Sequence, residues 1–369
     1  MVQLRFAIID SQMTLSLELT MKFNTTLLVP LGLILCACGG GGSSSSDTNN
    51  DTPPPPPVQD QTPKVSFSLS DAPADSITSV NVTVESITLK SAGDDEDDDS
   101  GLLVPILDDN DNPTTLTIDL MDYQDGETKL IIEGAEIEAG SYSNLILNTS
   151  GCPQNHNGST EFCWVEDSDG IKTLKTPSNK LKLGAFTVSD QGEQAYTIEF
   201  NLRSSLVSTA GGAGYNLKPH GIRIVDDAMV GSVTGMVDVS LLTAGEGCET
   251  VFDEDTDHGK IVYLYEGMLA DDAMMGDEFD PEEAENEIPE SVVAPFASDT
   301  ITYDADNETY HYTIAQLPAG DYTIAFSCSA VGDDPEEYDA LLIANPSEQV
   351  HELTIEAEAE TTINFTEIN

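Results

Sequence analysis

Three aspartates at alternate positions, Asp253, Asp255 and Asp257, are the residues whose types and spacing best suit metal chemistry. Alternate carboxylates in a turn can converge on one hard cation, and such oxygen ligands are the ones that calcium prefers. A complete twelve-residue calcium loop beginning at Asp253 would need Gly at its sixth position and Glu at its twelfth, where this chain has His258 and Leu264. The three aspartates are therefore candidate calcium ligands, and a solvated acidic turn is the alternative.

The cysteines allow either disulfide or metal chemistry. Two of the six cysteines lie in an N-terminal apolar segment, and the other four can form disulfides if the protein is exported. We expect local pairing, Cys152 with Cys163 and Cys248 with Cys328, although four cysteines allow three connectivities. Metal binding by these thiols is disfavoured because no CxxC pair or nearby set of histidines accompanies them.

A serine pair and a histidine raise the question of hydrolysis. Neither Ser204 nor Ser205 lies in a G-x-S-x-G elbow, and His220 has no Asp partner at a supporting spacing. A single histidine in or beside a strand is more often a packed or surface residue than a base. The sequence therefore offers no catalytic set, which favours a protein that is not an enzyme.

The N-terminal segment indicates where the chain works. From Met21 a cationic start precedes an apolar run too short to span a bilayer and then small residues, as in signal peptides. The end of the run, LLVPLGLILCAC followed by Gly39, resembles a bacterial lipobox with Cys38 as the lipid acceptor. Cys36 is an alternative acceptor, although the residue before it, Leu35, is large, and an ordinary secretory signal is the other alternative. Residue 39 is not Asp, which is compatible with sorting to the outer membrane.

The charge balance limits the partners. The chain has 67 acidic and 13 basic side chains, a formal net charge of −54. Such a surface repels polyanions, so nucleic acid is excluded as a partner. The charge also opposes compactness through self-repulsion, which suggests salty surroundings or bound cations. With 39% hydrophobic residues in alternating runs, packed domains are expected instead of a disordered chain.

The pattern along the chain predicts five parts. We interpret residues 1–20 as an over-extended gene start, 21–37 as a lipoprotein signal peptide and 38–63 as the lipidated cysteine with a flexible Gly/Ser/Pro stalk. Period-two alternation with turn residues between the runs then predicts two all-β, sandwich-like domains, 64–228 and 229–369. Residues 203–207 are the short helical candidate, and the acidic insert 268–295 is predicted to be a short helix or a loop.

The first predicted domain resembles a known family in several blocks that occur in the same order. The blocks are VSFSLSDAPADSITSVNVTVESITL, IDLMDYQDGETKLIIEGAEIEAGSYSNLIL, LKTPSNKLKLGAFTV, YTIEFNLRSSLV and YNLKPHGIRIVDD. In this order they resemble the domain-of-unknown-function 4382 family of bacterial lipoproteins. This resemblance implies a secreted, β-rich lipoprotein module. It brings no known activity and no catalytic residues.

The second predicted domain has, in order, a GxVxG opening, a VYLY strand, a hairpin and LPAGDYTIAF. In these motifs it is similar to the carboxypeptidase-regulatory-like, transthyretin-like β-sandwiches. It implies a structural or ligand-binding domain without a catalytic set. Six tyrosines at strand spacing in this part are best explained by cross-strand packing, with a sugar-stacking platform as the alternative.

These features together predict a lipid-anchored protein of the bacterial cell envelope, at the outer membrane, that acts as a non-enzymatic binding, adhesion or structural module. Its expected partners are the membrane, through the lipid anchor, and a protein or polysaccharide ligand. No cofactor is required, and calcium is the candidate ion. The alternative is a periplasmic accessory subunit, or an enzyme with a site built from loops of the first β domain.

Overall fold

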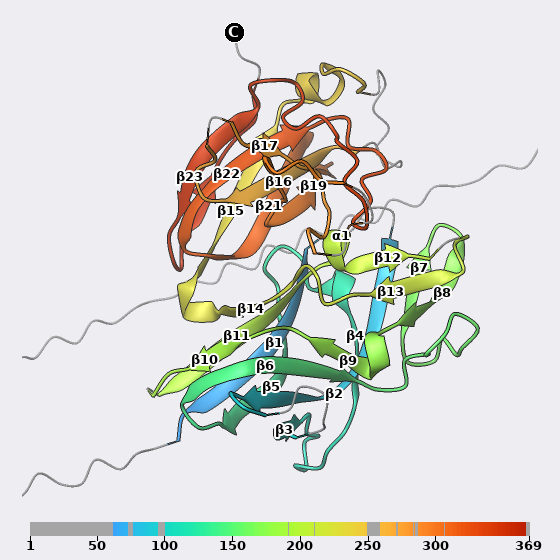
Figure 1. Cartoon of the computed structure of the whole chain (residues 1–369), viewed down its shortest axis with the longest axis vertical. Coiled ribbons are helices and arrows are strands. Elements are labelled where there is room, and N and C mark those ends of the chain that lie inside the picture. Colours follow the sequence, from blue (N-terminus) through green and yellow to red (C-terminus); the bar gives the residue numbers. More distant parts are fainter. Residues whose placement is uncertain are drawn as a thin grey trace, which may run out of the picture. The chain divides into compact units, whose positions relative to one another are not determined.

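The computed structural model describes residues 62–366 apart from gaps at 73–76, 95–99, 191, 210, 249–258, 271, 283, 285–286 and 306. Nearly all regular structure in this part is β-strand, so the predicted all-β class is confirmed (Figure 1). The helical elements are short: α1 (Leu202–Ser205) and the 3-10 turns η1 (Leu120–Asp122), η2 (Pro177–Asn179), η3 (Asp227–Met229) and η4 (Val239–Thr243). No helix among the described residues is long and apolar enough to cross a membrane.

The first β region, residues 62–226, has a smaller sheet of four strands. Its order is β14 (Ile222–Asp226), β11 (Glu193–Asn201), β1 (Lys64–Ala72) and β5 (Lys129–Glu136). Strands β1 and β11 run parallel and the other two pairs are antiparallel. Because β1 and β11 are far apart in the sequence, their pairing closes the region by joining its two ends.

The larger sheet of the first β region is built around the long strand β2 (Ile77–Ser91). Its main path is β10 (Phe186–Val188), β6 (Gly140–Thr149), β2, β7 (Trp164–Asp167), β8 (Gly170–Lys175), β13 (Gly214–Leu217) and β12 (Leu206–Ser208). Off this path, β3 (Leu102–Pro105) and β4 (Leu116–Asp119) pair with β2, and β9 (Lys180–Lys182) pairs with β6.

The alternating pattern of β2 changes phase at a bulge. Val80, Val82 and Val84 are buried, and so are Ile87 and Leu89 after the change. The pairing of β2 with β6 shifts register between Val84 and Ser86, so Glu85 is the extra residue. A bulge moves the following side chains to the opposite parity, and this explains the shift in the sequence pattern.

One hydrophobic core lies between the two sheets of the first β region. It takes Phe67 from β1 and Tyr196 from β11, whose rings stack with their centroids 5.9 Å apart, and Phe186 from β10 on the other sheet. The edge of Phe186 meets both rings, at 6.1 and 5.5 Å. Burying each such side chain contributes about 1.5–3 kcal/mol, so the packing of the two sheets stabilises the region.

The helix α1 connects the smaller sheet to the larger one. The Asn201 side chain accepts a hydrogen bond from the Arg203 backbone N–H at 3.2 Å, which caps the N-terminus of the helix. The expected helix at 203–207 is one turn at 202–205, because Leu206 and Val207 pair with β13 and are buried. Tertiary burial therefore overrides the local helical preference at these two residues.

The second β region, residues 230–366, consists of two four-stranded sheets and a separate strand pair. One sheet has the order β20 (Thr302–Asp304), β21 (Thr309–Pro318), β15 (Val230–Val237), β24 (Glu360–Thr362), and the other β19 (Ala297–Thr300), β16 (Ile261–Glu266), β22 (Gly320–Ser327), β23 (Val350–Ile355). The pair β17 (Met274–Met275) and β18 (Val292–Val293) lies within the acidic insert. The described part of this insert forms no helix, so the helical alternative for 268–295 is wrong.

The core of the second β region is built from alternate residues of both sheets. Val233 and Ile314 come from one sheet, and Val262, Ile324 and Phe326 come from the other. At Gly235 a Cβ atom would overlap the carbonyl oxygen of Ile363, so the second glycine of the GxVxG opening permits close backbone approach. These buried faces account for the alternation in the sequence.

Candidate functional site

Two of the predicted sites fall in parts that the structure does not describe. The lipid acceptor Cys38 precedes the first described residue, and the candidate calcium ligands Asp253, Asp255 and Asp257 lie in the gap at 249–258. Both remain predictions.

The four remaining cysteines form two disulfides. Cys152 is bonded to Cys163 across 11 positions, and Cys248 is bonded to Cys328 across 80. This is the local connectivity among the three that the sequence allows. Each bond lies within one β region, and Cys163 and Cys328 are fully buried in the two cores.

The serines and the histidine considered for hydrolysis all contact other side chains or the backbone. The hydroxyl of Ser204 donates to Glu278 Oε1, and that of Ser205 donates to the Asn201 carbonyl at 2.8 Å. His220 Nδ1 lies 3.5 Å from Asp280 Oδ2. The two serines are therefore bound to different acceptors, neither of which is the histidine.

The structure instead brings together three carboxylates of the second β region, which we call the acidic cluster: Asp277, Asp333 and Asp339. One carboxylate oxygen from each lies within 4.8 Å of the other two. Asp277 follows β17, whereas Asp333 and Asp339 belong to the segment between β22 and β23. Asp277 is fully buried and Asp339 is exposed, so the cluster extends from the interior to the surface.

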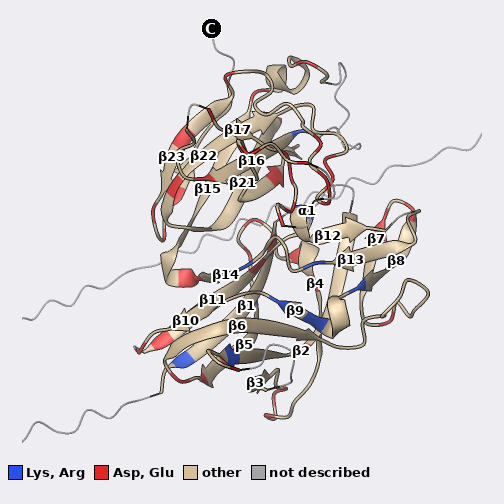
Figure 2. Ribbon diagram, viewed as in Figure 1, with Lys and Arg blue, Asp and Glu red and all other residues tan. Residues whose placement is uncertain are grey.

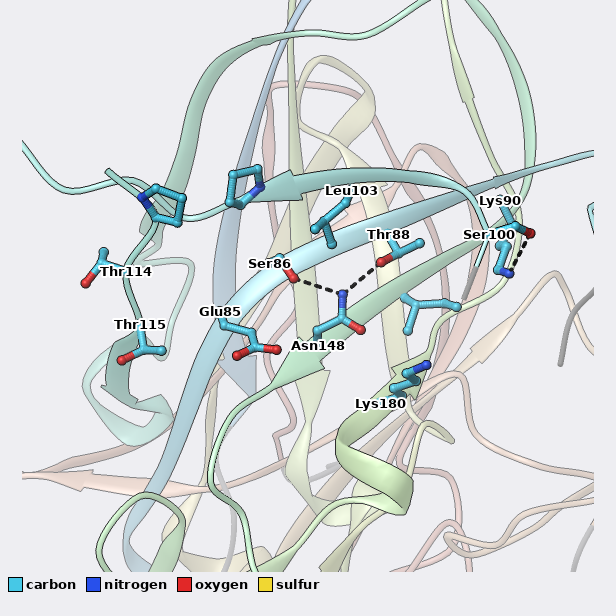
Figure 3. Close-up of a pocket in the computed structure, with 13 residues that line it drawn as sticks. Glu85, Ser86, Thr88, Lys90, Ser100, Leu103, Thr114, Thr115, Asn148 and Lys180 are labelled. Atoms are coloured by element: carbon cyan, nitrogen blue, oxygen red, sulfur yellow. Dashed lines mark hydrogen bonds between the residues drawn. The ribbon is translucent and has the colours of Figure 1, made fainter. Parts of the chain in front are cut away.

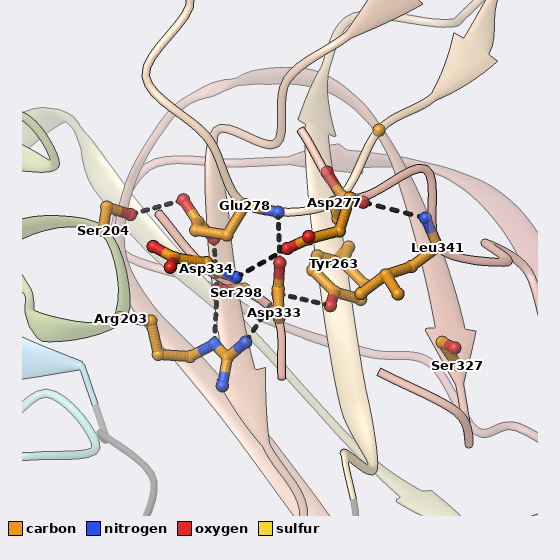
Figure 4. Close-up of polar contacts among 12 residues, drawn as sticks. Arg203, Ser204, Tyr263, Asp277, Glu278, Ser298, Ser327, Asp333, Asp334 and Leu341 are labelled. Atoms are coloured by element: carbon orange, nitrogen blue, oxygen red, sulfur yellow. Dashed lines mark hydrogen bonds and ion pairs between the residues drawn. The ribbon is translucent and has the colours of Figure 1, made fainter. Parts of the chain in front are cut away.

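Asp333 is held in place by contacts from several directions (Figure 4). Its Oδ2 accepts from Tyr263 Oη at 2.6 Å and pairs with Arg203 Nη2 at 2.8 Å. Its Oδ1 accepts from the Glu278 backbone N–H at 2.9 Å. Arg203 comes from α1 of the first β region, so one turn of helix positions the cation that meets this carboxylate.

Glu278 and Ser298 extend this polar network. Ser298 Oγ donates to Glu278 Oε2 at 2.7 Å and accepts from Arg203 Nε at 3.1 Å. The second oxygen of Glu278 accepts from Ser204. The network therefore connects two residues of α1 to buried polar groups of the second β region, and it fixes the side chains that surround the acidic cluster.

The surroundings of Asp277 and Asp333 disfavour the ionised forms of these two carboxyl groups. Burial raises the pKa of Asp333 to about 7, against the opposing influence of Arg203. Burial also raises the pKa of Asp277. Water alone therefore stabilises these two carboxylates poorly, and a bound proton or cation would stabilise them.

No local sequence pattern indicates the acidic cluster, because its members lie in two separate segments. Asp277 belongs to the acidic insert, and Asp333 and Asp339 belong to the stretch GDDPEEYD. Taken alone, each stretch has the composition of a solvated acidic loop. The two stretches come together only in the folded chain. The density of acidic residues in both stretches is the one signal that could have singled them out.

A second feature is an open cavity in the first β region, which we call the polar groove (Figure 3). Its volume is about 490 Å³. Strand β2 contributes Glu85, Ser86, Thr88 and Lys90, strand β6 contributes Ile146 and Asn148, and the remaining lining residues are Ser100, Leu103, Pro105, Pro113, Thr114, Thr115 and Lys180. The bulge at Glu85 changes the face that β2 presents at this point.

Hydrogen bonds fix the floor of the polar groove. Asn148 Nδ2 donates to Ser86 Oγ at 3.0 Å and to Thr88 Oγ1 at 2.9 Å, as Figure 3 shows. The amide is thereby oriented, while Leu103 and two prolines supply apolar surface on the walls. A groove with oriented amide and hydroxyl groups beside apolar patches can bind a ligand that has both hydroxyl groups and apolar faces.

The tyrosines of the second β region are mainly packing residues. Tyr263, Tyr265 and Tyr312 are almost fully buried. Tyr265 Oη donates to the Gly276 carbonyl at 2.6 Å, so its polar end is satisfied internally. Packing therefore accounts for these three, and they offer no exposed stacking surface.

Comparison with known proteins gives one family match. Residues 62–219 match the model of the family described as Domain of unknown function (DUF4382). The resemblance found in the sequence blocks is thereby supported over this part of the chain. No curated protein matches the sequence.

Among solved structures, similarities to pilins are weak. The minor pilin of Streptococcus agalactiae is 12% identical, with 81% of this chain and 94% of that chain covered and a TM-score of 0.17. The major pilin of Streptococcus pyogenes is also 12% identical, with 82% and 96% covered and a TM-score of 0.17. A TM-score this low does not establish a shared fold.

Proposed function

We propose that the protein is a lipid-anchored, non-enzymatic binding protein of the bacterial cell envelope that binds a polysaccharide in the polar groove. The N-terminal lipobox and the Gly/Ser/Pro stalk support the anchor at Cys38, and Gly39 supports sorting to the outer membrane. The polar groove is the observation that carries the binding function, because it is open and of ligand size.

The chemistry of the polar groove suits a carbohydrate. Sugar rings have hydroxyl groups at their edges and C–H groups on their faces, which suit the amide and hydroxyl groups beside Leu103 and the proline rings. Glu85 lines the groove together with Lys90 and Lys180, so the lining has charges of both signs, and a neutral polysaccharide is the preferred class because the acidic chain repels polyanions.

We further propose that residues 64–228 and 229–369 are two domains, the second of them carboxypeptidase-regulatory-like. The two large hydrophobic clusters support this division, since one ends at Ile222 and the other begins at Val233. The pairing of two four-stranded sheets in the second β region supports a sandwich of that kind.

An enzyme remains the alternative, and one observation favours it. Asp333, whose pKa is raised to about 7, lines a cavity of about 500 Å³ together with Asp167, Asp169 and Tyr215. A carboxyl group that titrates near neutral pH could act as a general acid or base. A screen with hydrolase substrates that detected turnover abolished by Asp333→Asn would favour this alternative.

A variant in which a large side chain blocks the polar groove tests the binding function. Thr115 is an exposed lining residue, so Thr115→Trp should fill the polar groove without disturbing the core. Thr160→Trp adds the same side chain at an exposed site outside the groove. In calorimetry with a panel of soluble acidic and neutral polysaccharides, we expect at least one ligand whose affinity falls at least tenfold with Thr115→Trp and is unchanged with Thr160→Trp. Absence of binding, or equal binding by both variants, would contradict the proposal.

A further inference from the structure

The acidic cluster has the geometry of a site for one metal ion, and we propose that Asp277, Asp333 and Asp339 bind calcium. This inference is independent of the polar groove and of its ligand. Its ligands differ from Asp253, Asp255 and Asp257, which the sequence spacing suggested.

The spacing of the carboxylates fits a shared cation. Calcium binds oxygen atoms at 2.3–2.6 Å, so two ligands on opposite sides of the ion lie about 4.6–5.2 Å apart and neighbouring ligands lie closer. One carboxylate oxygen from each residue of the acidic cluster lies within 4.8 Å of those from the other two. One ion can therefore contact all three carboxylates without any large movement of the backbone.

Asp277 provides an independent indication of a ligand. Its Oδ2 accepts a hydrogen bond from the Leu341 backbone N–H at 2.8 Å, whereas its buried Oδ1 has no hydrogen-bond partner among the described residues. Leaving a buried polar atom without a partner typically costs about 1–3 kcal/mol, and more for a charged group. A cation held by this carboxylate would supply the missing interaction.

Hydrogen bonds from the protein already orient the other two carboxylates. Asp333 accepts from Tyr263 and from the Glu278 backbone, and Asp339 Oδ2 accepts from the Asp334 backbone N–H at 3.0 Å. A carboxylate fixed in this way loses little conformational freedom when a metal binds. Figure 4 shows Asp277 and Asp333 on neighbouring segments in the centre of this network.

The charge balance of the second β region also favours a cation. Residues 230–369 contain 34 acidic side chains and a single basic one, Lys260. Figure 2 shows that red, the colour of Asp and Glu, predominates among the coloured residues of the described part of this region. Lys260 Nζ donates to the Cys328 carbonyl at 2.8 Å. Arg203 of the first β region supplies one positive charge to Asp333, which leaves the other two carboxylates of the cluster without an ion pair among the described residues.

Calcium fits the cluster better than other common ions. All the donors are carboxylate oxygens, which suit hard cations, whereas zinc and copper sites usually include His or Cys. Magnesium requires a near-ideal octahedron and gives up its water reluctantly. Calcium tolerates an irregular shell, and the exposed position of Asp339 lets water complete it.

The test compares two sets of variants of the full-length protein, purified in detergent and stripped with a chelator. Asp277→Asn and the exposed Asp339→Asn remove one charge each from the acidic cluster. Asp253→Asn, Asp255→Asn and Asp257→Asn, combined in one chain, remove the site that the sequence suggested. Calorimetry with calcium chloride and thermal unfolding with and without calcium are the measurements.

We expect one calcium site whose affinity falls at least tenfold with Asp277→Asn and with Asp339→Asn, and stays unchanged in the triple variant. In chelator, Asp277→Asn should melt no lower than the wild type, because a buried charge is removed. If that variant fails to fold, Asp339→Asn decides alone. Absence of calcium binding, or loss of binding in the triple variant only, would overturn the proposal.

Discussion

The buried carboxylates of the two β regions differ in their partners and in their access to solvent. In the first, Glu199 accepts from Ser70 Oγ at 2.6 Å and lies 3.6 Å from Arg223, while Asp71 is enclosed and has no ion pair among the described residues. Burial raises the pKa of both groups. In the second, the acidic cluster opens to solvent at Asp339. A carboxyl that is fully enclosed can be neutralised only by a proton or a built-in Arg, whereas one that faces water can also take a metal ion.

The difference matches the distribution of basic residues. Ten of the 13 Lys and Arg residues lie in the first β region and one lies in the second. Several of them face acids of the second region: Arg203 pairs with Asp333, and Lys218 Nζ lies 2.7 Å from Glu336. Arg223 lies 4.5 Å over the ring of Phe296 and donates to its carbonyl. Basic residues of the first β region therefore help to neutralise the negative charge of the second.

The largest loss of unfolding free energy is expected when the buried ion pair between Arg203 and Asp333 is broken. The side chains of Arg203 and Asp333 are only 5% and 2% exposed. Arg203→Ala leaves the Asp333 carboxylate buried without its cation, which should cost about 3–5 kcal/mol of unfolding free energy. Denaturant unfolding in chelator at pH 9, where the Asp333 carboxyl of the wild type is ionised, is the measurement.

The matched control is Lys218→Ala, which removes a pair whose side chains are 25% and 42% exposed. An exposed pair contributes about 1 kcal/mol or less. Equal losses for the two variants would show that Arg203 does not stabilise the buried carboxylate.

Removing either disulfide should lower the free energy of unfolding, and the two losses should differ because the disulfides close loops of different length. Cys248 and Cys328 are 80 positions apart, whereas Cys152 and Cys163 are 11 apart. The chain-entropy account of disulfides predicts that losing the longer loop costs about 1.8 kcal/mol more than losing the shorter one. Denaturant unfolding of the two Cys-to-Ala double variants tests this. A larger loss from the 152–163 pair would contradict it.

Neutralising the enclosed carboxyl of the first region should change the pH dependence of stability. Because the pKa of Asp71 is raised by burial and by Glu199, the folded state holds a proton that the unfolded state has released. Stability should therefore fall as pH rises above the ordinary carboxyl range. Asp71→Asn should flatten this fall and add on the order of 1 kcal/mol at neutral pH.

The measurement is thermal unfolding between pH 4 and pH 8 in chelator. Asp321→Asn, at an exposed carboxyl of the second region, is the control and should follow the wild-type profile. If the thermal stability of Asp71→Asn depended on pH in the same way as that of the wild type, the Asp71 carboxyl would not be protonated in the folded state.

Local patterns predicted the strands well and the candidate sites poorly. The alternation of β2, including its change of phase at Glu85, reports directly which side chains are buried. The acidic insert has no such pattern, because its short strands β17 and β18 owe their position to tertiary contacts. The acidic cluster joins Asp277 to Asp333, and the polar groove joins β2 to β6 and to residues 100–115, so both exist only after the chain has folded.

The most direct test of the account is the chemical state of the N-terminus, because the disulfides, the external ligand and access to calcium all presuppose an exported, anchored protein. Full-length chain expressed in a bacterial host with an alkyne-labelled fatty acid is recovered from membranes and examined by mass spectrometry. We predict a mature protein that begins at acylated Cys38, with label and membrane association lost in Cys38→Ala and kept in Cys36→Ala. An unmodified mature N-terminus, or label that depends on Cys36, would contradict the account.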